Sequence, residues 1–496
     1  MTVAPEDCWQ FNEEKPLLRS SRELRIKAVA ALPELLKGLK SEAEGVLQVV
    51  ESARRLAGDW DEESRCDVIR DLGRHARLDT HTGSATLVVG GEVVTGTAAF
   101  LLPAEGAPIV AFRNGRQLTD NFASDLRIVG RTALGSFQIH CPVCYTRKAM
   151  TGANDGWTLA SPINELVRID YADARPVKKV RVVLNNFDYE CGDPVTSETA
   201  FTRIGTPMVV QLSGRSAEFR RRSDYDEVHP LLRAGLLRSA SLTEFSCEVL
   251  TETDDDLLVL ANDVASVCTF ANGASVTVAM LECLDADNGV VRRIVTQPVG
   301  SRYQTDAIIA DFNLPRLFAE SFETHVLMRR SELPWHKLPS YCGSLEDMPY
   351  LEQKFAALMG AIEFFMRTSL IEAGLDERRV TTLDFNKLIG ETRKRLGWNI
   401  PKHYNSGDTT RLLRNAVVHG SETPTKDNVE FRLMFNKWRL FLFRRILIRL
   451  GYQGDVVSPH KGWSDSSAVN DFSEARNSFD ASDADSHPFA QFVKHL

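Results

Sequence analysis

The stretch Ala85-Thr86-Leu87-Val88-Val89-Gly90-Gly91-Glu92-Val93-Val94-Thr95 decides the fold class of the central part of this 496-residue chain. Two runs rich in β-branched and apolar residues flank a Gly-Gly pair, which is the residue type that a tight hairpin turn requires. Similar runs follow without alternating helices, so we expect an antiparallel sheet or sandwich rather than βαβ units. The further expected strands lie at 108–112, 126–129, 180–184, 208–212, 245–250, 256–260, 264–270, 275–281 and 290–296.

The chain has a different pattern on both sides of these strands. Leucine, isoleucine and valine recur at near-helical spacing between residues 20 and 80, which predicts an N-terminal helical segment over residues 1–82. The β-rich region, interpreted as a sensor-like domain, then covers residues 83–329. Pro334, Pro339, Gly343 and Pro349 make residues 330–350 the clearest linker in the sequence.

The sequence after this linker predicts only helices up to residue 455. Apolar residues at helical spacing indicate helices near 355–370, 383–396, 408–419 and 428–450, which make an all-α four-helix bundle over residues 351–455. Residues 456–496 are rich in Ser, Asp, Asn and Ala and are expected to form an acidic flexible tail. The expected fold class is therefore a multidomain α+β protein.

Charge divides the chain unevenly. The whole sequence has 59 Lys and Arg against 67 Asp and Glu, a net charge of -8. Residues 351–450 alone have 18 Lys and Arg against 11 Asp and Glu, which is an excess of seven positive charges. The predicted bundle is thus the basic part of an acidic protein, as expected for a module that handles phosphates.

The ends and the cysteines of the chain indicate where the protein works. The start, Met1 to Asp7, lacks the basic residues and apolar core of a signal peptide. No run of about 18 uncharged apolar residues is present, so no membrane span is expected. Nine cysteines are scattered along a large chain, which favours reduced thiols. We therefore expect a cytoplasmic protein.

The segment Arg414-Asn415-Ala416-Val417-Val418-His419 is the strongest candidate for an active site. On a helix, Ala416 and Val417 lie on one side, toward the core of the bundle, whereas Asn415 and His419 lie four residues apart on the opposite side. Arg414 projects from the flank, and Arg411 lies one turn before Asn415. An arginine, an asparagine and a histidine thus share one outward surface at the end of a short helix.

These three side chains suit the cleavage of RNA by its own 2′-hydroxyl group. Histidine exchanges a proton near neutral pH, and its place at a helix C-terminus favours the protonated form. The guanidinium of arginine matches phosphate oxygens. The asparagine amide orients the histidine or the phosphate. We expect no metal and no cofactor for this chemistry.

Residues 350–450 resemble a HEPN domain, whose motif is Arg, often followed by Asn, Asp or His, and then three or four residues before His. Arg414, Asn415 and His419 match that motif position by position. The resemblance implies a metal-independent endoribonuclease whose helical bundle forms a homodimer with one composite site. The layout is similar to the ApeA-like family of bacterial antiphage defence, which implies abortive infection, a phage-derived trigger sensed by the β-rich half, and RNA as the substrate, with tRNA as a candidate. The segment from Leu260 to Gly273 resembles a sheet-and-turn segment of such N-terminal domains.

Other residues give weaker signals. Arg70 to His75 has the Arg-x4-His spacing too, so the spacing alone is close to what chance produces; Gly73 and the strands that follow argue against a second site. The run Arg220-Arg221-Arg222 indicates either a nucleic-acid contact or a solvated loop. Candidate RNA-binding residues beside the motif are Lys402, His403, Arg393, Lys394 and Arg395.

Two alternatives remain open at this point. The helical bundle could be a non-catalytic module that binds RNA or forms a dimer in a regulatory protein. A metal-dependent enzyme could instead centre on Cys141 and Cys144, whose Cys-x2-Cys spacing supplies half of a zinc site. The second half of such a site has no clear counterpart in the sequence, although His140 or Cys191 would be possible ligands.

Overall fold

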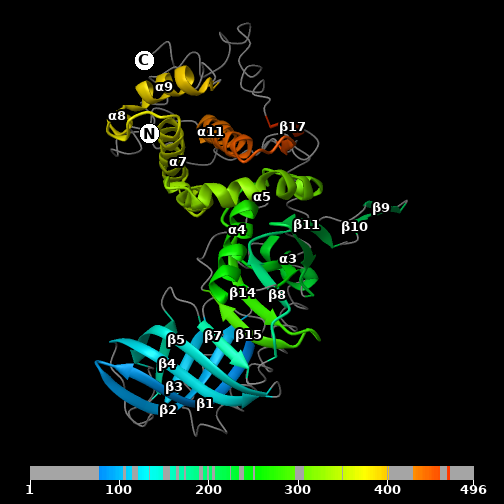
Figure 1. Ribbon diagram of the computed structural model, residues 1–496, viewed down its shortest axis with the longest axis vertical. Coiled ribbons are helices and arrows are strands. Elements are labelled where there is room, and N and C mark those ends of the chain that lie inside the picture. Colours follow the sequence, from blue (N-terminus) through cyan, green and yellow to red (C-terminus); the bar gives the residue numbers. More distant parts are fainter. Residues whose placement is uncertain are drawn as a thin grey trace, which may run out of the picture.

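The computed structural model describes residues 78–469 with internal gaps, at 104–107, 114–120, 133–134, 149–156, 163–166, 172–174, 189–193, 198–199, 204–206, 224, 234–238, 250–251, 297–306, 349, 399, 401–427 and 458–465. The helical segment predicted over residues 1–82 lies outside this range up to residue 77, and its last five residues are a wrong prediction because they belong to strand β1 (Leu78–Val89). The described part is a mixed α+β structure, with strands at one end and the C-terminal helices at the other (Figure 1). No helix in the described ranges is long and apolar enough to cross a bilayer.

One 13-stranded antiparallel sheet runs through the described part, in the order β11-β12-β13-β8-β14-β15-β7-β5-β4-β1-β2-β3-β6. An additional β5–β6 pairing closes its last six strands on themselves. The antiparallel sheet confirms the sequence prediction for this region. The strand bounds are β1 Leu78–Val89, β2 Glu92–Pro103, β3 Ile109–Arg113, β4 Asn121–Thr132, β5 Gly135–Lys148, β6 Trp157–Pro162, β7 Val167–Tyr171, β8 Lys179–Asn185, β11 Met208–Leu212, β12 Arg215–Arg221, β13 Ser241–Glu248, β14 Thr277–Leu284 and β15 Val290–Val295. A separate pair is formed by β9 Pro194–Ser197 and β10 Ala200–Arg203.

The predicted Gly-Gly hairpin is present between β1 and β2. Val89 pairs with Glu92, which leaves Gly90 and Gly91 as the two turn residues. Both have positive φ, 59° and 87°, as a two-residue hairpin turn with matching twist requires. The side chains of Leu87 and Phe100, on the two strands, are fully buried. The turn therefore fixes the register that points the apolar side chains inward.

The buried residues form two large cores rather than one. The first lies among strands β1–β5 and β7 and includes Phe100, Phe112 and Phe137. The second joins the rest of the sheet to the C-terminal helices and includes Phe245, Phe318 and Trp438. The C-terminal helices thus share their core with strands β8 and β11–β15.

Residues 256–260 and 264–270 were expected to be strands, and this expectation is wrong. They belong to helix α4 (Asp254–Asn272), which begins at the N-cap Thr253 and ends at Gly273. Twelve of its 19 residues are buried. Its sequence therefore contains a continuous apolar run and lacks the one-sided apolar pattern by which a surface helix is recognised. The proposed sheet-and-turn resemblance of the segment from Leu260 to Gly273 is wrong for the same reason.

Residues 330–350 are folded and packed, although the sequence predicted a linker. Helix α5 (Leu314–Arg330) is followed by η2 (Pro334–Lys337), α6 (Leu338–Gly343) and η3 (Ser344–Glu346). Trp335, Leu338, Cys342 and Leu345 are buried in the second core. Pro334 and Pro339 stand in the first turns of short helices, where a missing N–H costs nothing. The domain bounds assigned from the sequence stay a prediction.

Three of the four predicted C-terminal helices are present. They are α7 (Leu351–Glu372), α9 (Phe385–Leu396) and α11 (Asn428–Arg449), with the short α8 (Glu377–Thr381) before α9. Both α9 and α11 pack against α7. The third predicted helix, at 408–419, lies outside the described residues, so the complete four-helix bundle stays a prediction.

The expected flexible tail is docked at its start. Strands β16 (Asp455–Val457) and β17 (Ser466–Ala468) pair with each other, and Val456 and Val469 are buried. Arg444 of α11 donates a hydrogen bond to the carbonyl oxygen of Ala468 at 2.7 Å. The Ser-rich composition alone predicts that this part of the chain is solvated. In the structure, the pairing of β16 with β17 satisfies backbone hydrogen-bonding groups of these two strands.

Candidate functional site

The predicted catalytic residues Arg414, Asn415 and His419 lie outside the described residues, and so do Arg411, Lys402 and His403. Their place in the chain is nevertheless bounded by two described helices. Helix α9 ends at Leu396, and helix α11 begins at Asn428. The catalytic assignment stays a prediction.

Helix α9 brings the remaining candidates, Arg393, Lys394 and Arg395, to its last turn. The helix ends there because Gly397 adopts a left-handed conformation, with φ of 62°. Arg393 donates a hydrogen bond to the carbonyl oxygen of Ile400 and so fixes the chain that leaves the helix. Lys394 and Arg395 are exposed. A negatively charged partner could therefore contact Lys394 and Arg395, whereas Arg393 has a structural contact.

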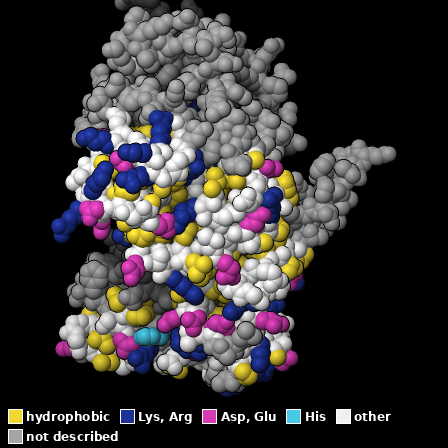
Figure 2. Space-filling view, turned by 45° about the horizontal axis from the view of Figure 1, so that its top comes forward, with side chains coloured by type: hydrophobic (Ala, Val, Ile, Leu, Met, Phe, Trp, Pro, Cys, Tyr) yellow, Lys and Arg dark blue, Asp and Glu magenta, His cyan; other side chains and the backbone are white. Residues whose placement is uncertain are grey.

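Arg395 has a weak intrahelical ion pair with Glu391, at 3.7 Å. Exposed pairs of this kind contribute about 0.3–0.5 kcal/mol and exchange easily for another anion. Figure 2 shows Lys and Arg side chains gathered over one part of the described surface, toward the end that carries the C-terminal helices. The basic character predicted for this part of the chain is thus visible on its surface.

Helix α11 adds a partly buried cation that the sequence reading did not single out. The guanidinium of Arg445 lies over the rings of Trp398 and Phe441, at 5.2 Å and 5.6 Å from their centroids. Burial lowers the pKa of Arg445 to about 10, which still leaves it charged at neutral pH. Trp398 stacks on Phe365 of α7 and precedes the segment 401–427 by only three residues. A cation held by aromatic rings therefore lies close to the C-terminal end of α9.

The weak zinc candidate, Cys141 and Cys144, lies inside the first core. Both cysteines belong to β5 and are fully buried as thiols outside any disulfide bond. Burial raises the pKa of the Cys144 thiol to about 11, which disfavours the thiolate that binds a metal. Nearby, His140 is paired with Asp125 at 2.9 Å. Among the described residues, no group of three or more His, Cys, Asp or Glu side chains is arranged to hold a metal ion.

The basic run Arg220-Arg221-Arg222 is not a loop over its first two residues, which end strand β12. Arg220 pairs with Glu218 at 2.7 Å. The guanidinium of Arg221 lies 4.1 Å from the centroid of the Tyr225 ring. The first two arginines thus have partners within the fold.

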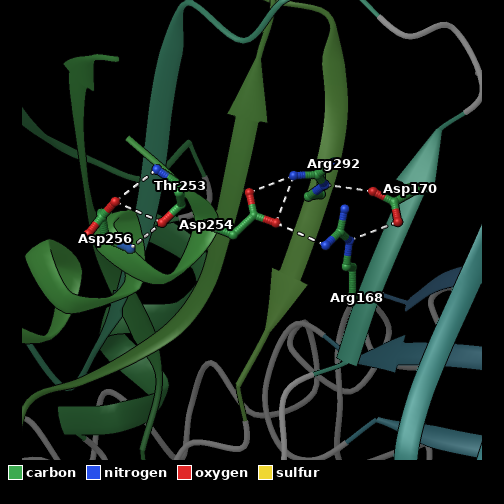
Figure 3. A network of polar contacts seen from close by, with 6 residues as sticks. All are labelled: Arg168, Asp170, Thr253, Asp254, Asp256 and Arg292. Carbon is green, nitrogen blue, oxygen red and sulfur yellow. Dashed lines mark hydrogen bonds and ion pairs between the residues drawn. The ribbon is translucent and has the colours of Figure 1, made fainter. Parts of the chain in front are cut away.

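The sequence analysis did not predict a ring of four side chains with alternating charges, which lies where strands β7 and β15 meet the start of helix α4 (Figure 3). Its members are Arg168, Asp170, Arg292 and Asp254. Asp170 accepts hydrogen bonds from Arg168 at 2.8 Å and from Arg292 at 2.6 Å. Asp254, in the first turn of α4, accepts a hydrogen bond from Arg292 at 2.7 Å and pairs with Arg168 at 3.1 Å. The ring joins β7, β15 and α4, and its charges cancel.

A cleft of about 450 Å³ opens beside this ring of charges. Its wall combines charged and apolar side chains, namely Arg168, Val177, Val249, Glu252, Thr253, Asp254, Asp255, Leu257, Cys283 and Arg292. Thr253 and Asp256 form a capping box next to the cleft, in which the Thr253 hydroxyl accepts a hydrogen bond from the backbone of Asp256. The pattern Thr-x-x-Asp before an apolar run is a helix-start signal that the sequence does contain.

The ring of charges shifts the pKa values of Asp170 and Arg292. Burial raises the pKa of Asp170, but hydrogen bonds from Arg168 and Arg292 outweigh it and hold the pKa below the ordinary value. Burial likewise acts to lower the pKa of Arg292, yet its bonds to Asp170 and Asp254 leave the pKa raised. Both shifts stabilise the charged forms of Asp170 and Arg292.

Comparisons with known proteins found no match for this chain among protein-family models, curated proteins or solved structures.

Proposed function

We propose that this protein is a metal-independent endoribonuclease of the HEPN type, with Arg414, Asn415 and His419 as its catalytic residues. The observation that carries the proposal is the sequence motif together with its setting in the most basic part of the chain. Support comes from the helices on both sides: α9 and α11 occur where the same reading of the sequence predicted them, and both pack on α7.

The proposed reaction needs only groups that the motif supplies. The 2′-oxygen of the ribose forms a bond to the adjacent phosphorus, and the bond from phosphorus to the 5′-oxygen breaks. His419 donates a proton to the departing 5′-oxygen, and Arg414 stabilises the extra negative charge on the phosphoryl oxygens. A base takes the proton of the 2′-hydroxyl, which is the role of a second histidine when two copies of the chain pair. The products are a 2′,3′-cyclic phosphate and a 5′-hydroxyl end.

The remaining parts of the proposal concern assembly and control. We propose a homodimer in which two motif segments face each other and form one composite site. The β-rich half is proposed to recognise a phage-derived trigger, and RNA cleavage then arrests the infected cell. Lys394 and Arg395, exposed at the end of α9, are proposed to contact the RNA phosphates.

The test compares the parent protein with Arg414→Ala and His419→Ala on tRNA and single-stranded RNA in the presence of EDTA. Loss of a proton donor or a phosphate-binding cation should slow cleavage about 100-fold or more. A control with the same residue spacing is Arg70→Ala combined with His75→Ala, which should cleave like the parent. The proposal fails if the parent cleaves none of these RNAs, or if both motif variants cleave normally. RNA binding without cleavage would support the non-catalytic alternative.

A further inference from the structure

Helix α4 connects the charged ring at the sheet to the C-terminal helices. Its 19 residues span about 28 Å. In Figure 1 it stands between the strands β8 and β14 and the helix α5. Polar contacts fasten it at its start, its middle and its end, to three different parts of the molecule. Each of these contacts involves a side chain or carbonyl group with a defined partner.

The start of α4 is fastened to the junction of the two cores. Asp254 contacts Arg292 of β15 and Arg168 of β7, and these arginines also share Asp170. Strand β7 contributes Val167 and Ile169 to the first core, whereas α4 packs in the second core. The ring of charges is therefore a direct contact between the strands of the first core and α4.

The middle of α4 is fastened to α5 by a buried carboxylate. Asp263 has a relative exposure of only 3% and pairs with Arg329 at 2.6 Å. His325 lies 3.4 Å from the same carboxylate oxygen and is also buried. A buried carboxylate holds its partners firmly, because separation would leave an uncompensated charge. Rotation of α4 about its own axis is opposed by this contact.

The end of α4 is fastened to α11. The Arg439 side chain, 4% exposed, donates a hydrogen bond from Nη2 to the carbonyl oxygen of Gly273 at 3.0 Å. Its Nε lies 3.4 Å from Glu346, which also pairs with Lys354 of α7. A Cβ atom at Gly273 would lie 2.4 Å from the Arg439 guanidinium, so only glycine permits this approach.

We propose that α4 is a coupling element through which changes at the β7–β15 junction reach α11. Packed interiors do not deform continuously, so a helix with buried contacts along its length moves as a unit or not at all. Loosening Asp254 from its arginines thus weakens the contact between Gly273 and Arg439. The use of this coupling to control RNA cleavage rests on the proposed function, since α11 begins at Asn428, shortly after the predicted catalytic segment in the sequence. The coupling itself does not depend on the proposed function.

Hydrogen–deuterium exchange of the full-length protein tests the coupling. The variant Asp254→Asn removes the carboxylate charge from the ring, and Asp255→Asn removes the same charge from the next residue of the same helical turn. Asp255 is exposed and lines the same cleft. We expect Asp254→Asn to speed exchange in residues 428–449 by about fivefold or more, the lower end of typical coupling between sites. Asp255→Asn should leave exchange in α11 within twofold of the parent.

Coupling between two sites is reciprocal, so the opposite perturbation gives a second test. Arg439→Lys keeps the charge but cannot reproduce the guanidinium contacts, and it should speed exchange in the first turn of α4 and in β15. The proposal is overturned if Asp254→Asn affects only α4, β7 and β15, or if Asp255→Asn speeds exchange in α11 equally. It is also overturned if Arg439→Lys leaves exchange at the start of α4 unchanged.

The outcomes for the coupling and for the ribonuclease can be separated. Faster exchange in α11 of Asp254→Asn, in a protein that cleaves no RNA, supports the coupling and contradicts the proposed function. RNA cleavage by the parent, with unchanged exchange in α11 of Asp254→Asn, contradicts the coupling and leaves the ribonuclease proposal intact.

Discussion

Replacing Arg439 by methionine should destabilise the second core by about 2–4 kcal/mol. Methionine retains much of the apolar stem, so the loss comes mainly from polar contacts. The carbonyl of Gly273 loses its donor in a buried position, which costs about 1–3 kcal/mol. Glu346 loses one cation but keeps Lys354, so the full cost of about 3–5 kcal/mol for a lone buried charge does not apply.

The measurement is chemical denaturation followed by tryptophan fluorescence, since Trp438 is fully buried next to Arg439 in the same helix. Arg432→Met is the matched control, because Arg432 is exposed on α11 and its loss should change stability by no more than about 0.5 kcal/mol. If Arg439→Met is as stable as this control, Arg439 does not fasten α11 to α4, and the reasoning is refuted.

Three further perturbations test the account of α4 and its surroundings. Thr253→Ala removes the capping box with Asp256 and should lower the free energy of unfolding by about 1 kcal/mol in urea denaturation; no change would argue against the cap. Gly273→Ala places a Cβ against Arg439 at a φ of 69°, so its melting temperature should fall, and an unchanged value would contradict the close approach. The pKa of Asp170 is lowered by folding, so its charge stabilises the protein above its unfolded pKa of about 3.9 and this contribution is lost as pH falls through the folded value. Asp170→Asn should therefore be less stable than the parent at pH 6, and the gap should close below about pH 4; a constant gap would contradict the assignment.

The strands and amphipathic helices could be predicted from the sequence because each has one strong local signal. The Gly-Gly pair fixes the β1–β2 turn, and the apolar residues of α7 recur at helical spacing along its buried face. Each signal involves residues that are close together in the sequence, so it does not depend on the rest of the fold.

Helix α4 could not be recognised by periodicity because its environment is apolar on nearly all sides. From Asp263 to Asn272 every residue except Ser266 is buried, and Val264, Val267 and Thr269 are β-branched residues that favour strands. The local helix signals are the N-cap at Thr253 and the left-handed C-cap at Gly273, and the strand prediction overlooked both. The packed segment 330–350 was missed for a related reason, since prolines that begin short helices resemble prolines that interrupt them.

The charged ring was beyond sequence reasoning because its members are far apart in the chain. Asp170 and Arg292 are 122 positions apart and meet only when β7 pairs with β15. Asp254 joins them only when α4 packs on the sheet. The candidate catalytic motif is the opposite case, since its residues are neighbours on one short predicted helix and can be proposed from the sequence alone.

The most direct test of the central claim is the chemistry of the RNA ends that the protein produces in EDTA. Attack by the 2′-hydroxyl group predicts a 2′,3′-cyclic phosphate on the upstream fragment and a 5′-hydroxyl on the downstream fragment, and His419→Ala should abolish both. A 3′-hydroxyl with a 5′-phosphate, or cleavage that persists at the parent rate in His419→Ala, would contradict the account.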